Sequence, residues 1–309
     1  MRFLLLLSVL AIMTASGCVT GTTGTTGGPG LVVEKFLPSL DTIESGEPVS
    51  LQLEVRNRGD YNNAMTIAEL MDIDPTEWAV AGGTIRDLGT LLAPDLESQT
   101  EGGLATAAWE ITSPLLKRGQ RLVYPVRARV YYLYETTATK PVWFVTSEEL
   151  RRIVQLGDAL PSESTIMTGG PLAVTVNAGQ FVKAREWSES KFQLQIRIQN
   201  SGAGQVRGRN YPIAMEVTWP SWVTPVKGVC PEQIQWGAVL YNDIPPGLSQ
   251  PTGTYIMMWD GRSTDVTCEF MIVSPPASRT KGDFEVKLNY IYSVDATTQI
   301  TVKGMEEFI

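Results

Sequence analysis

The stretch VRARVYYLYETTAT, residues 126–139, decides the fold, because apolar residues recur in it at every second position. Alternation of this kind predicts a β-strand with one buried face. A second stretch, FEVKLNYIYSVDAT at residues 284–297, repeats the pattern and the Tyr-x-Tyr motif. The positions expected to face a core are Val126, Ala128, Val130, Tyr132, Tyr134, Phe284, Val286, Leu288, Tyr290 and Tyr292.

Further towards the N-terminus of each half lies another matching pair of stretches. VSLQLEVRNRG, residues 49–59, and FQLQIRIQNSG, residues 192–202, both alternate and both end in Asn-x-Gly. Each predicts a half-buried strand running into a turn. The asparagine side chain is expected to hydrogen-bond the backbone two residues ahead, and the glycine to supply a positive φ.

Three more features occur in the same order in both halves of the sequence, between these strands. They are a tryptophan near a strand end (Trp109; Trp259), an Ile-x-Ser-Pro segment (111–114; 272–275) and a basic residue–glycine turn (Arg118-Gly119; Lys281-Gly282). Five features in one order indicate an internal repeat. We therefore expect an all-β protein of two tandem Ig-like β-sandwich domains, residues 31–146 and 171–303, followed by a tail at 304–309.

The segment between the two repeats predicts the clearest helix of the chain. In TSEELRRIVQLGDAL, residues 146–160, Ser147 is the expected N-cap, and acidic residues follow it in the first turn. Leu150, Ile153, Val154 and Gly157 fall on one stripe of such a helix. Residues 147–170 are therefore expected to form a helical linker that joins the two domains.

The N-terminus has the pattern of an export signal. Arg2 precedes an apolar run at 3–13, which is too short to span a bilayer, and small residues follow it up to Cys18. The residues ASGC, 15–18, resemble a lipobox, with Ala15 where leucine is more common. This resemblance implies cleavage of a signal peptide at residues 1–17 and a lipid on Cys18. The alternative is a secreted protein with an incidental cysteine.

Residues 19–30, VTGTTGTTGGPG, show no apolar periodicity and predict a flexible tether. Together with Cys18 they form the expected lipidated and tethering segment, residues 18–30. No other stretch of the sequence reaches about 18 uninterrupted apolar residues, the length that a membrane-spanning helix needs. We therefore expect an exported protein that is anchored to the membrane through its lipid.

The composition argues against several classes of function. The chain has 25 basic and 33 acidic residues, a net charge of −8, so a nucleic-acid partner is not expected. Its 309 residues include no histidine, which excludes Ser-His-Asp and Cys-His catalysis and histidine-ligated zinc. We expect no enzymatic activity.

Two of the three cysteines lie in the second repeat of this exported chain. Cys230 and Cys268 are expected to form a disulfide, which would stabilise the fold by about 3–4 kcal/mol in the chain-entropy model. The alternative is two buried free thiols. A reactive thiol is disfavoured because Lys227 is its only basic neighbour in the sequence.

Acidic loops and aromatic residues give the remaining candidate sites. Asp72, Asp74 and Glu77 crowd one loop, for which a solvated turn is favoured over weak calcium binding, since the EF-hand pattern is missing. The same interpretation applies to Asp260 and Asp265. Aromatic residues concentrate in the second repeat, and packing at the rim of the core is favoured over recognition there. The candidate patch consists of Trp219, Trp222 and Trp236.

The Asn-x-Gly turn, the mid-domain tryptophan and the Tyr-x-Tyr strand resemble CARDB-type and S-layer-associated Ig-like domains. That resemblance covers most of the mature chain and implies export, a structural or adhesive role and no catalysis. The leading hypothesis is therefore a cell-envelope lipoprotein on the outer surface, which acts as a binding, adhesion or structural module towards an envelope protein or glycan. The alternatives are a self-assembling surface or filament subunit that pairs β-strands between copies, and a carbohydrate-binding accessory protein.

Overall fold

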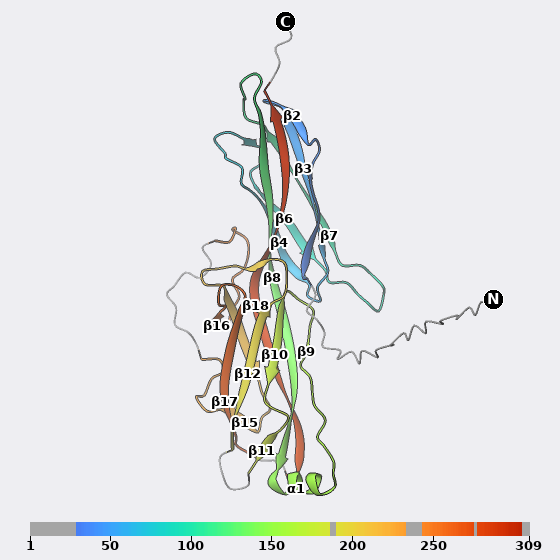
Figure 1. Ribbon diagram of the computed structural model, residues 1–309, viewed down its shortest axis with the longest axis vertical. Coiled ribbons are helices and arrows are strands. Elements are labelled where there is room, and N and C mark those ends of the chain that lie inside the picture. The colour runs from blue at the N-terminus through green and yellow to red at the C-terminus, as the bar shows by residue number, and fades with distance from the viewer. Residues whose placement is uncertain (1–28, 186–189, 233–242, 275–276, 305–309) are drawn as a thin grey trace, which may run out of the picture.

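Two long strands, β8 (Arg121–Thr146) and β18 (Arg279–Lys303), form the centre of the molecule in the computed structural model. The structure describes residues 29–185, 190–232, 243–274 and 277–304. The two strands pair antiparallel along their whole length, from Arg121 opposite Lys303 to Val145 opposite Arg279. They run through both ends of an elongated molecule made of two stacked β-sandwiches (Figure 1).

The strands are arranged in three sheets, of which the largest is shared by both sandwiches. The first outer sheet has the order β1 (Leu31–Pro38), β3 (Pro48–Asn57), β7 (Leu104–Thr112), β5 (Ala79–Val80). The second outer sheet has the order β10 (Leu172–Asn177), β12 (Ser190–Asn200), β17 (Ser263–Ile272), β15 (Val223–Pro225). The shared sheet contains β16 (Thr254–Met257), β14 (Pro212–Thr218), β18, β8, β4 (Asn63–Met71) and β6 (Ile85–Leu91), in that order.

Four short strands add to the margins of the shared sheet. Those that pair with β18 are β2 (Thr42–Glu44) and β13 (Gln205–Val206), and those that pair with β8 are β9 (Ile166–Met167) and β11 (Val182–Ala184). We call the sandwich built on the first outer sheet sandwich 1 and the other sandwich 2. The predicted all-β class with Ig-like sandwiches is confirmed, with one described helix, α1 (Ser147–Gln155).

The two sandwiches have matching strand orders, as the sequence repeat predicts. In the shared sheet β4 and β6 flank β8 just as β14 and β16 flank β18. All ten positions expected to face the core are buried. Alternation along each central strand therefore extends one continuous hydrophobic core through both sandwiches.

The pairing of β8 with β18 means that each sandwich contains strand segments from both halves of the sequence. The last part of β18, residues 294–303, pairs with the first part of β8, residues 121–130, in sandwich 1. The end of β8 likewise lies in sandwich 2, against the beginning of β18. The limits 31–146 and 171–303, drawn from sequence order, do not describe this exchange, because each long strand crosses from one sandwich into the other.

The helix α1 differs in position from the linker expected at residues 147–170. It lies at the far end of sandwich 2, where β8 ends, and not between the sandwiches (Figure 1). Its N-cap is Thr146, not Ser147: Thr146 is extended, and its hydroxyl accepts a hydrogen bond from the N–H of Glu149 at 3.3 Å. Ile153 is buried as expected, whereas Val154 is 70% exposed.

The two Asn-x-Gly turns form with the predicted asparagine hydrogen bond, but the positive φ expected of their glycines is wrong. Asn57 and Asn200 each accept a hydrogen bond from the N–H of the glycine two residues ahead. Neither Gly59 nor Gly202 has a positive φ. A Cβ on Gly59 would lie 2.1 Å from the hydroxyl of Tyr134, so these glycines are needed for close approach to the core tyrosines.

The four core tyrosines form one cluster where the two sandwiches meet. Tyr132, Tyr134, Tyr290 and Tyr292 are fully buried, and neighbouring rings have centroids 5.8–6.2 Å apart. Each hydroxyl has a hydrogen-bond partner: Leu31 N–H, Gly169 C=O, the Thr136 hydroxyl and Asn200 Oδ1, respectively. The satisfied hydroxyls allow polar rings to be buried at this junction.

Two of the repeated features do not have equivalent structures. Gly119 has a positive φ in a turn, as expected, but Gly282 lies inside β18 opposite Val142. Trp109 is fully buried in β7, whereas Trp259 is 83% exposed in the turn that precedes β17. The sequence match between these two tryptophans is therefore wrong as a structural equivalence.

Candidate binding site

The strand β17 of sandwich 2 has one edge that is only partly paired. On one side it pairs with β12 along its whole length, Ser263–Ile272. On the other side, among the described strands, only β15 pairs with it, at Phe270–Ile272. The residues from 263 to 269 therefore lie at an edge of the second outer sheet.

The direction of the backbone groups along this edge follows from two hydrogen bonds. The carbonyl of Glu269 accepts from the N–H of Val226 at 2.8 Å, and that of Ser263 accepts from the N–H of Trp259 at 2.7 Å. Successive residues of a strand direct their backbone N–H and C=O groups to opposite sides. The N–H and C=O groups of Asp265 and Thr267 therefore also point away from β12. Within the described ranges, these outward groups have no backbone or side-chain partner. We call residues 264–268 the open edge.

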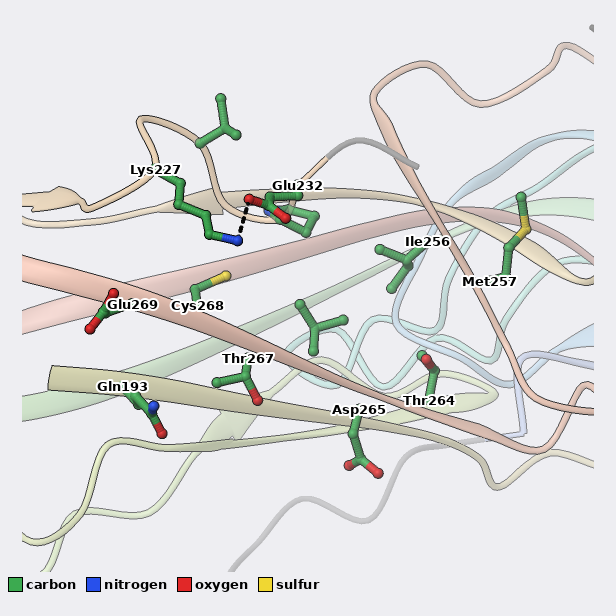
Figure 2. Close-up of a pocket in the computed structure, with 13 residues that line it drawn as sticks. Gln193, Lys227, Glu232, Ile256, Met257, Thr264, Asp265, Thr267, Cys268 and Glu269 are labelled. Carbon is green, nitrogen blue, oxygen red and sulfur yellow. Dashed lines mark ion pairs between the residues drawn. The ribbon is translucent and has the colours of Figure 1, made fainter. Parts of the chain in front are cut away.

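A cavity of about 460 Å³ lies along the open edge, and Figure 2 shows the residues that line it. Val266 and Cys268 of β17 contribute from one sheet, and Ile256 and Met257 of β16 contribute from the other. A loop that contains the Lys227–Glu232 ion pair, with an N–O distance of 2.7 Å, closes one end. We call this cavity, which runs beside β17 and reaches β16 of the other sheet, the slot.

The two sandwiches differ at the position beside the slot. Trp109 of β7 lies opposite Leu51, and Cys268 of β17 lies opposite Leu194. Leu51 and Leu194 have the same position relative to Asn57 and Asn200, so Trp109 and Cys268 are equivalent by register. A buried indole fills the space in sandwich 1 that a small cysteine leaves open in sandwich 2.

The edge of β7 is also closed by an arginine. Arg86 Nε donates to the carbonyl of Ala108 at 3.0 Å, and its guanidinium lies over the Trp109 ring at 5.8 Å from the centroid. Ala108 and Thr267 directly precede the equivalent residues Trp109 and Cys268, so they correspond to each other. The residues that follow agree with this match, because the carbonyl of Glu110 accepts from Ala81 N–H just as the carbonyl of Glu269 accepts from Val226 N–H. No equivalent donor reaches Thr267 from the described part of sandwich 2.

The predicted disulfide between Cys230 and Cys268 is confirmed. The two Cα atoms are 5.7 Å apart, a usual separation for a disulfide. Since Cys268 belongs to β17 and Cys230 to the loop after β15, the bond fixes that loop over the slot. Cys268, whose small side chain leaves room for the slot, therefore also fixes the loop that closes one end of it.

The charges around the slot are mainly acidic. Glu232 pairs with Lys227 and raises the pKa of that ammonium through a hydrogen bond. Asp265 and Glu269 line the slot from β17, and the nearest cation to Asp265 is Arg197 at 4.0 Å. Three carboxylates and one lysine among the lining residues give a net negative slot.

An exposed aromatic turn continues the slot. A second cavity, of about 720 Å³, shares Met257 and Thr264 with the first and is lined also by Tyr211 and Trp259. Three non-glycine residues with positive φ gather there: Asn210, Tyr211 and Asp260. Positive φ is uncommon for a bulky residue such as Tyr211 and marks local strain. The sequence interpretation missed Trp259 because it matched it to the buried Trp109.

The structure describes two of the three tryptophans of the candidate patch. Trp219 and Trp222 are half-buried and pack on Phe270 and Phe144, with ring centroids 5.5 and 6.3 Å apart. Trp236 and the lipidation candidate Cys18 lie outside the described residues. The arrangement of the two described tryptophans agrees with the favoured interpretation, packing at the rim of the core.

Two of the three acidic residues considered for weak calcium binding interact with neighbouring side chains. Asp72 pairs with Arg127 at 2.9 Å, and Asp74 accepts hydrogen bonds from the N–H and hydroxyl of Thr76. These bonds lower the pKa of Asp74. Within the described residues no group of three His, Cys, Asp or Glu side chains is arranged to hold a metal ion. Nor does any described helix have the length and apolar character of a membrane span.

Comparisons with known proteins identify no family. No family model matches the chain, and no curated protein matches it. Two solved structures are similar over 89% of the chain at 10% identity: the Enterococcus faecalis adhesin ACE, described as binding its ligands by a collagen hug model, and the collagen adhesin CNA from S. aureus. They are covered to 95% and 93%, with TM-scores of 0.16 and 0.14. Similarity at this level supports no conclusion about what this chain binds.

Proposed function

We propose that this chain is a non-catalytic binding protein of the cell envelope, attached to the outer face of the membrane through a lipid on Cys18. The observation that carries the binding role is the difference between the two sandwiches. The same edge is filled by Trp109 and bonded by Arg86 in sandwich 1, but forms an open slot in sandwich 2. A slot lined by both apolar and charged side chains, next to an exposed tryptophan, suits recognition of a partner.

The N-terminal sequence supports the proposed location. The apolar run, the small residues before Cys18 and the Thr/Gly-rich tether have the order of a lipoprotein signal. A diacylated cysteine would make the attachment stable, because a single chain binds membranes only marginally. The CARDB-type or S-layer-associated kinship belongs to the same proposal and rests on the sequence motifs alone.

The attachment is tested by the intact mass of the protein from its native membrane. We expect the polypeptide to begin at Cys18 and to carry the additional mass of a lipid. A Cys18→Ser variant should be recovered in the soluble fraction. Recovery of that variant in the membrane fraction would contradict lipid attachment.

The binding role is tested separately, with the soluble Cys18→Ser protein. We expect it to sediment with isolated envelopes of the source cell, in a saturable manner. A protein that sediments only when it carries its lipid has no binding role, and this outcome would refute the proposal. The separation matters because a lipid alone is sufficient to bring any protein to the membrane.

A second candidate function, glycan binding, is favoured by the aromatic turn beside the slot. Trp259 is 83% exposed, and Asn210 and Asp260 beside it can offer polar groups to sugar hydroxyls. A Trp259→Ala variant should then lose binding to envelope polysaccharide on a glycan array. A Trp219→Ala variant is the comparison, since Trp219 packs on Phe270 in the core rim. Equal binding by both variants would exclude the aromatic turn.

A further inference from the structure

The open edge has the properties of a site for strand addition. A sheet edge presents unpaired N–H and C=O groups, and an extended peptide can bond to them as an additional strand. Among the described residues, the groups without a partner belong to Asp265 and Thr267, and the neighbouring bonds from Trp259 and Val226 limit the free window at both ends. We propose that the open edge binds an extended, basic peptide segment of a partner protein by β-strand addition. This inference rests on the proposed binding function and specifies its partner.

The size and lining of the slot determine what such a segment must contain. A strand beside residues 264–268 would be about five residues long, or roughly 17 Å at ~3.3 Å per residue. Its alternate side chains would point into the slot, towards Val266, Ile256 and Met257. Those positions call for residues of the size of valine or threonine, since the slot holds about 460 Å³.

The other side chains of the segment would face the outer side of the sheet. The residues of β17 exposed on that side are Asp265, Thr267 and Glu269, and Gln193 of β12 lies opposite Glu269. Two carboxylates along one edge favour lysine or arginine at the opposing positions, because opposite charges across a strand pair stabilise it. Glu232 at the end of the slot adds to this preference, although Lys227 pairs with it. The occupant is therefore a segment that alternates small β-branched and basic residues.

Sandwich 1 shows what prevents the same binding elsewhere. In β7 the position equivalent to Thr267 is Ala108, whose carbonyl already accepts from Arg86. The adjacent space is filled by Trp109, whose indole N–H donates to the carbonyl of Thr84 at 2.7 Å. One chain should therefore bind one peptide, in sandwich 2.

The test uses the purified soluble Cys18→Ser protein and a synthetic peptide of sequence Thr-Lys-Val-Lys-Val-Lys-Thr, acetylated and amidated at its ends. Two comparison peptides carry glutamate in place of lysine, or N-methyl groups on the backbone nitrogens of both the lysines and the valines, so that the peptide cannot donate hydrogen bonds to the edge in either strand orientation. We expect saturable binding of the first peptide at one per chain, and at least tenfold weaker binding of the other two. Equal affinity for all three, or no binding of the first at millimolar concentration, would overturn the inference.

The decisive variant is Thr267→Pro. Proline removes the outward N–H, whereas the bonds to β12 are made by the neighbouring residues, so the strand can keep its pairing. We expect it to weaken peptide binding about tenfold, while Thr267→Val, which retains the N–H, binds like the parent protein. Unchanged binding by the proline variant would refute strand addition.

Two further measurements protect the test against misfolding. If Thr267→Pro lowers the melting temperature, the variant Asp265→Lys/Glu269→Lys leaves the backbone unchanged and should also weaken binding at least tenfold. In the parent protein, peptide should slow amide hydrogen exchange at Asp265 and Thr267 selectively. The inference would be contradicted if the charge variant bound the peptide as tightly as the parent protein and the peptide did not slow exchange at these two amides.

Failure of this inference can be told apart from failure of the proposed function. Envelope binding that persists in Thr267→Pro, without peptide binding by the parent, refutes strand addition and leaves the binding function in place. Peptide binding by a protein that does not bind envelopes refutes the envelope function and leaves strand addition in place.

Discussion

Leu133 of β8 lies directly opposite Ile291 of β18. The two residues are the central positions of the two Tyr-x-Tyr motifs, so the repeats of the sequence meet at equivalent points. On either side of this pair, Tyr132 lies opposite Tyr292 and Tyr134 opposite Tyr290. A two-fold pseudosymmetry therefore passes through the Leu133–Ile291 pair and relates sandwich 1 to sandwich 2.

This arrangement predicts that neither half of the sequence folds alone. A fragment of residues 29–165 would contain all of β8 but would lack residues 294–303 of β18, which pair with it in sandwich 1. We expect this fragment to unfold without a cooperative transition, because the buried face and one edge of β8 would be left exposed. Circular dichroism during thermal unfolding measures this.

The matched control is the same fragment mixed with residues 166–309. The mixture should recover a cooperative transition and elute as a one-to-one complex. Cooperative unfolding of the fragment alone, at the temperature of the whole protein, would show that sandwich 1 does not need β18.

The close approach at Gly59 predicts a specific double-mutant result. A Cβ at this position would lie 2.1 Å from the Tyr134 hydroxyl and 2.9 Å from Gly30 Cα. Gly59→Ala should therefore lower the free energy of unfolding by about 1–3 kcal/mol, the usual cost of overpacking a core. Denaturant unfolding measures the difference.

Removal of the Tyr134 hydroxyl should relieve part of this cost. The double variant Gly59→Ala/Tyr134→Phe is expected to be more stable than the sum of the two single variants implies, which gives a coupling energy of at least about 0.5 kcal/mol. Strict additivity would show that the alanine is accommodated by movement of the Gly30 backbone instead.

Much of the fold can be predicted from the sequence because one-sided alternation is a local signal. The ten predicted core positions and the Cys230–Cys268 disulfide are correct, since they depend on strand period and on the number of cysteines. The exchange of β8 and β18 cannot be predicted from alternation, because that pattern gives the buried face of a strand and not its partner. It therefore leaves open which sandwich each half of a 26-residue strand joins.

The candidate site is harder to predict, because it depends on a difference between equivalent strands of the two sandwiches. Trp109 and Cys268 become equivalent only through the registers of β7 and β17, and sequence motifs matched Trp109 to Trp259 instead. The open edge likewise depends on the shortness of β15, whose three residues give no strong sequence signal. Residues such as Asp265 and Thr267 are ordinary strand residues until their backbone direction is known.

Burial of the core tyrosines predicts loss of stability at alkaline pH. Desolvation raises the pKa of Tyr292 to about 12 and the pKa values of Tyr132 and Tyr290 well above the usual 10. The folded protein thus keeps these protons where the unfolded chain loses them. The stabilisation is complete below pH 10 and decreases as the pH rises from 10 towards 12.

Urea unfolding between pH 8 and 11.5 measures this dependence. Each tyrosine that stays protonated in the folded state should contribute a slope of about 1.4 kcal/mol per pH unit above pH 10. Tyr292→Phe should reduce the slope by one such contribution. A free energy of unfolding that is constant from pH 10 to 11.5 would contradict the burial of the tyrosine cluster.

The closure of sandwich 1 by Arg86 predicts a stability effect that a surface arginine would not show. Besides Ala108, its guanidinium donates to the carbonyls of Ala81, Gly82, Gly83 and Ile85 at 2.9–3.0 Å. Arg86→Ala should lower the free energy of unfolding by about 1–2 kcal/mol, because these carbonyls lose their donor together. Lysine should not restore the loss, since one ammonium cannot replace the planar fork.

Arg197→Ala is the matched control for this prediction. Arg197 also lies on an outer sheet, but its side chain is 58% exposed and its ion pair with Asp265 spans 4.0 Å. Its removal should change stability by less than about 0.5 kcal/mol. Arg86→Ala should still bind only one peptide per chain, because Trp109 continues to fill the space beside β7. A second bound peptide in this variant would show that the arginine, and not the indole, keeps sandwich 1 closed.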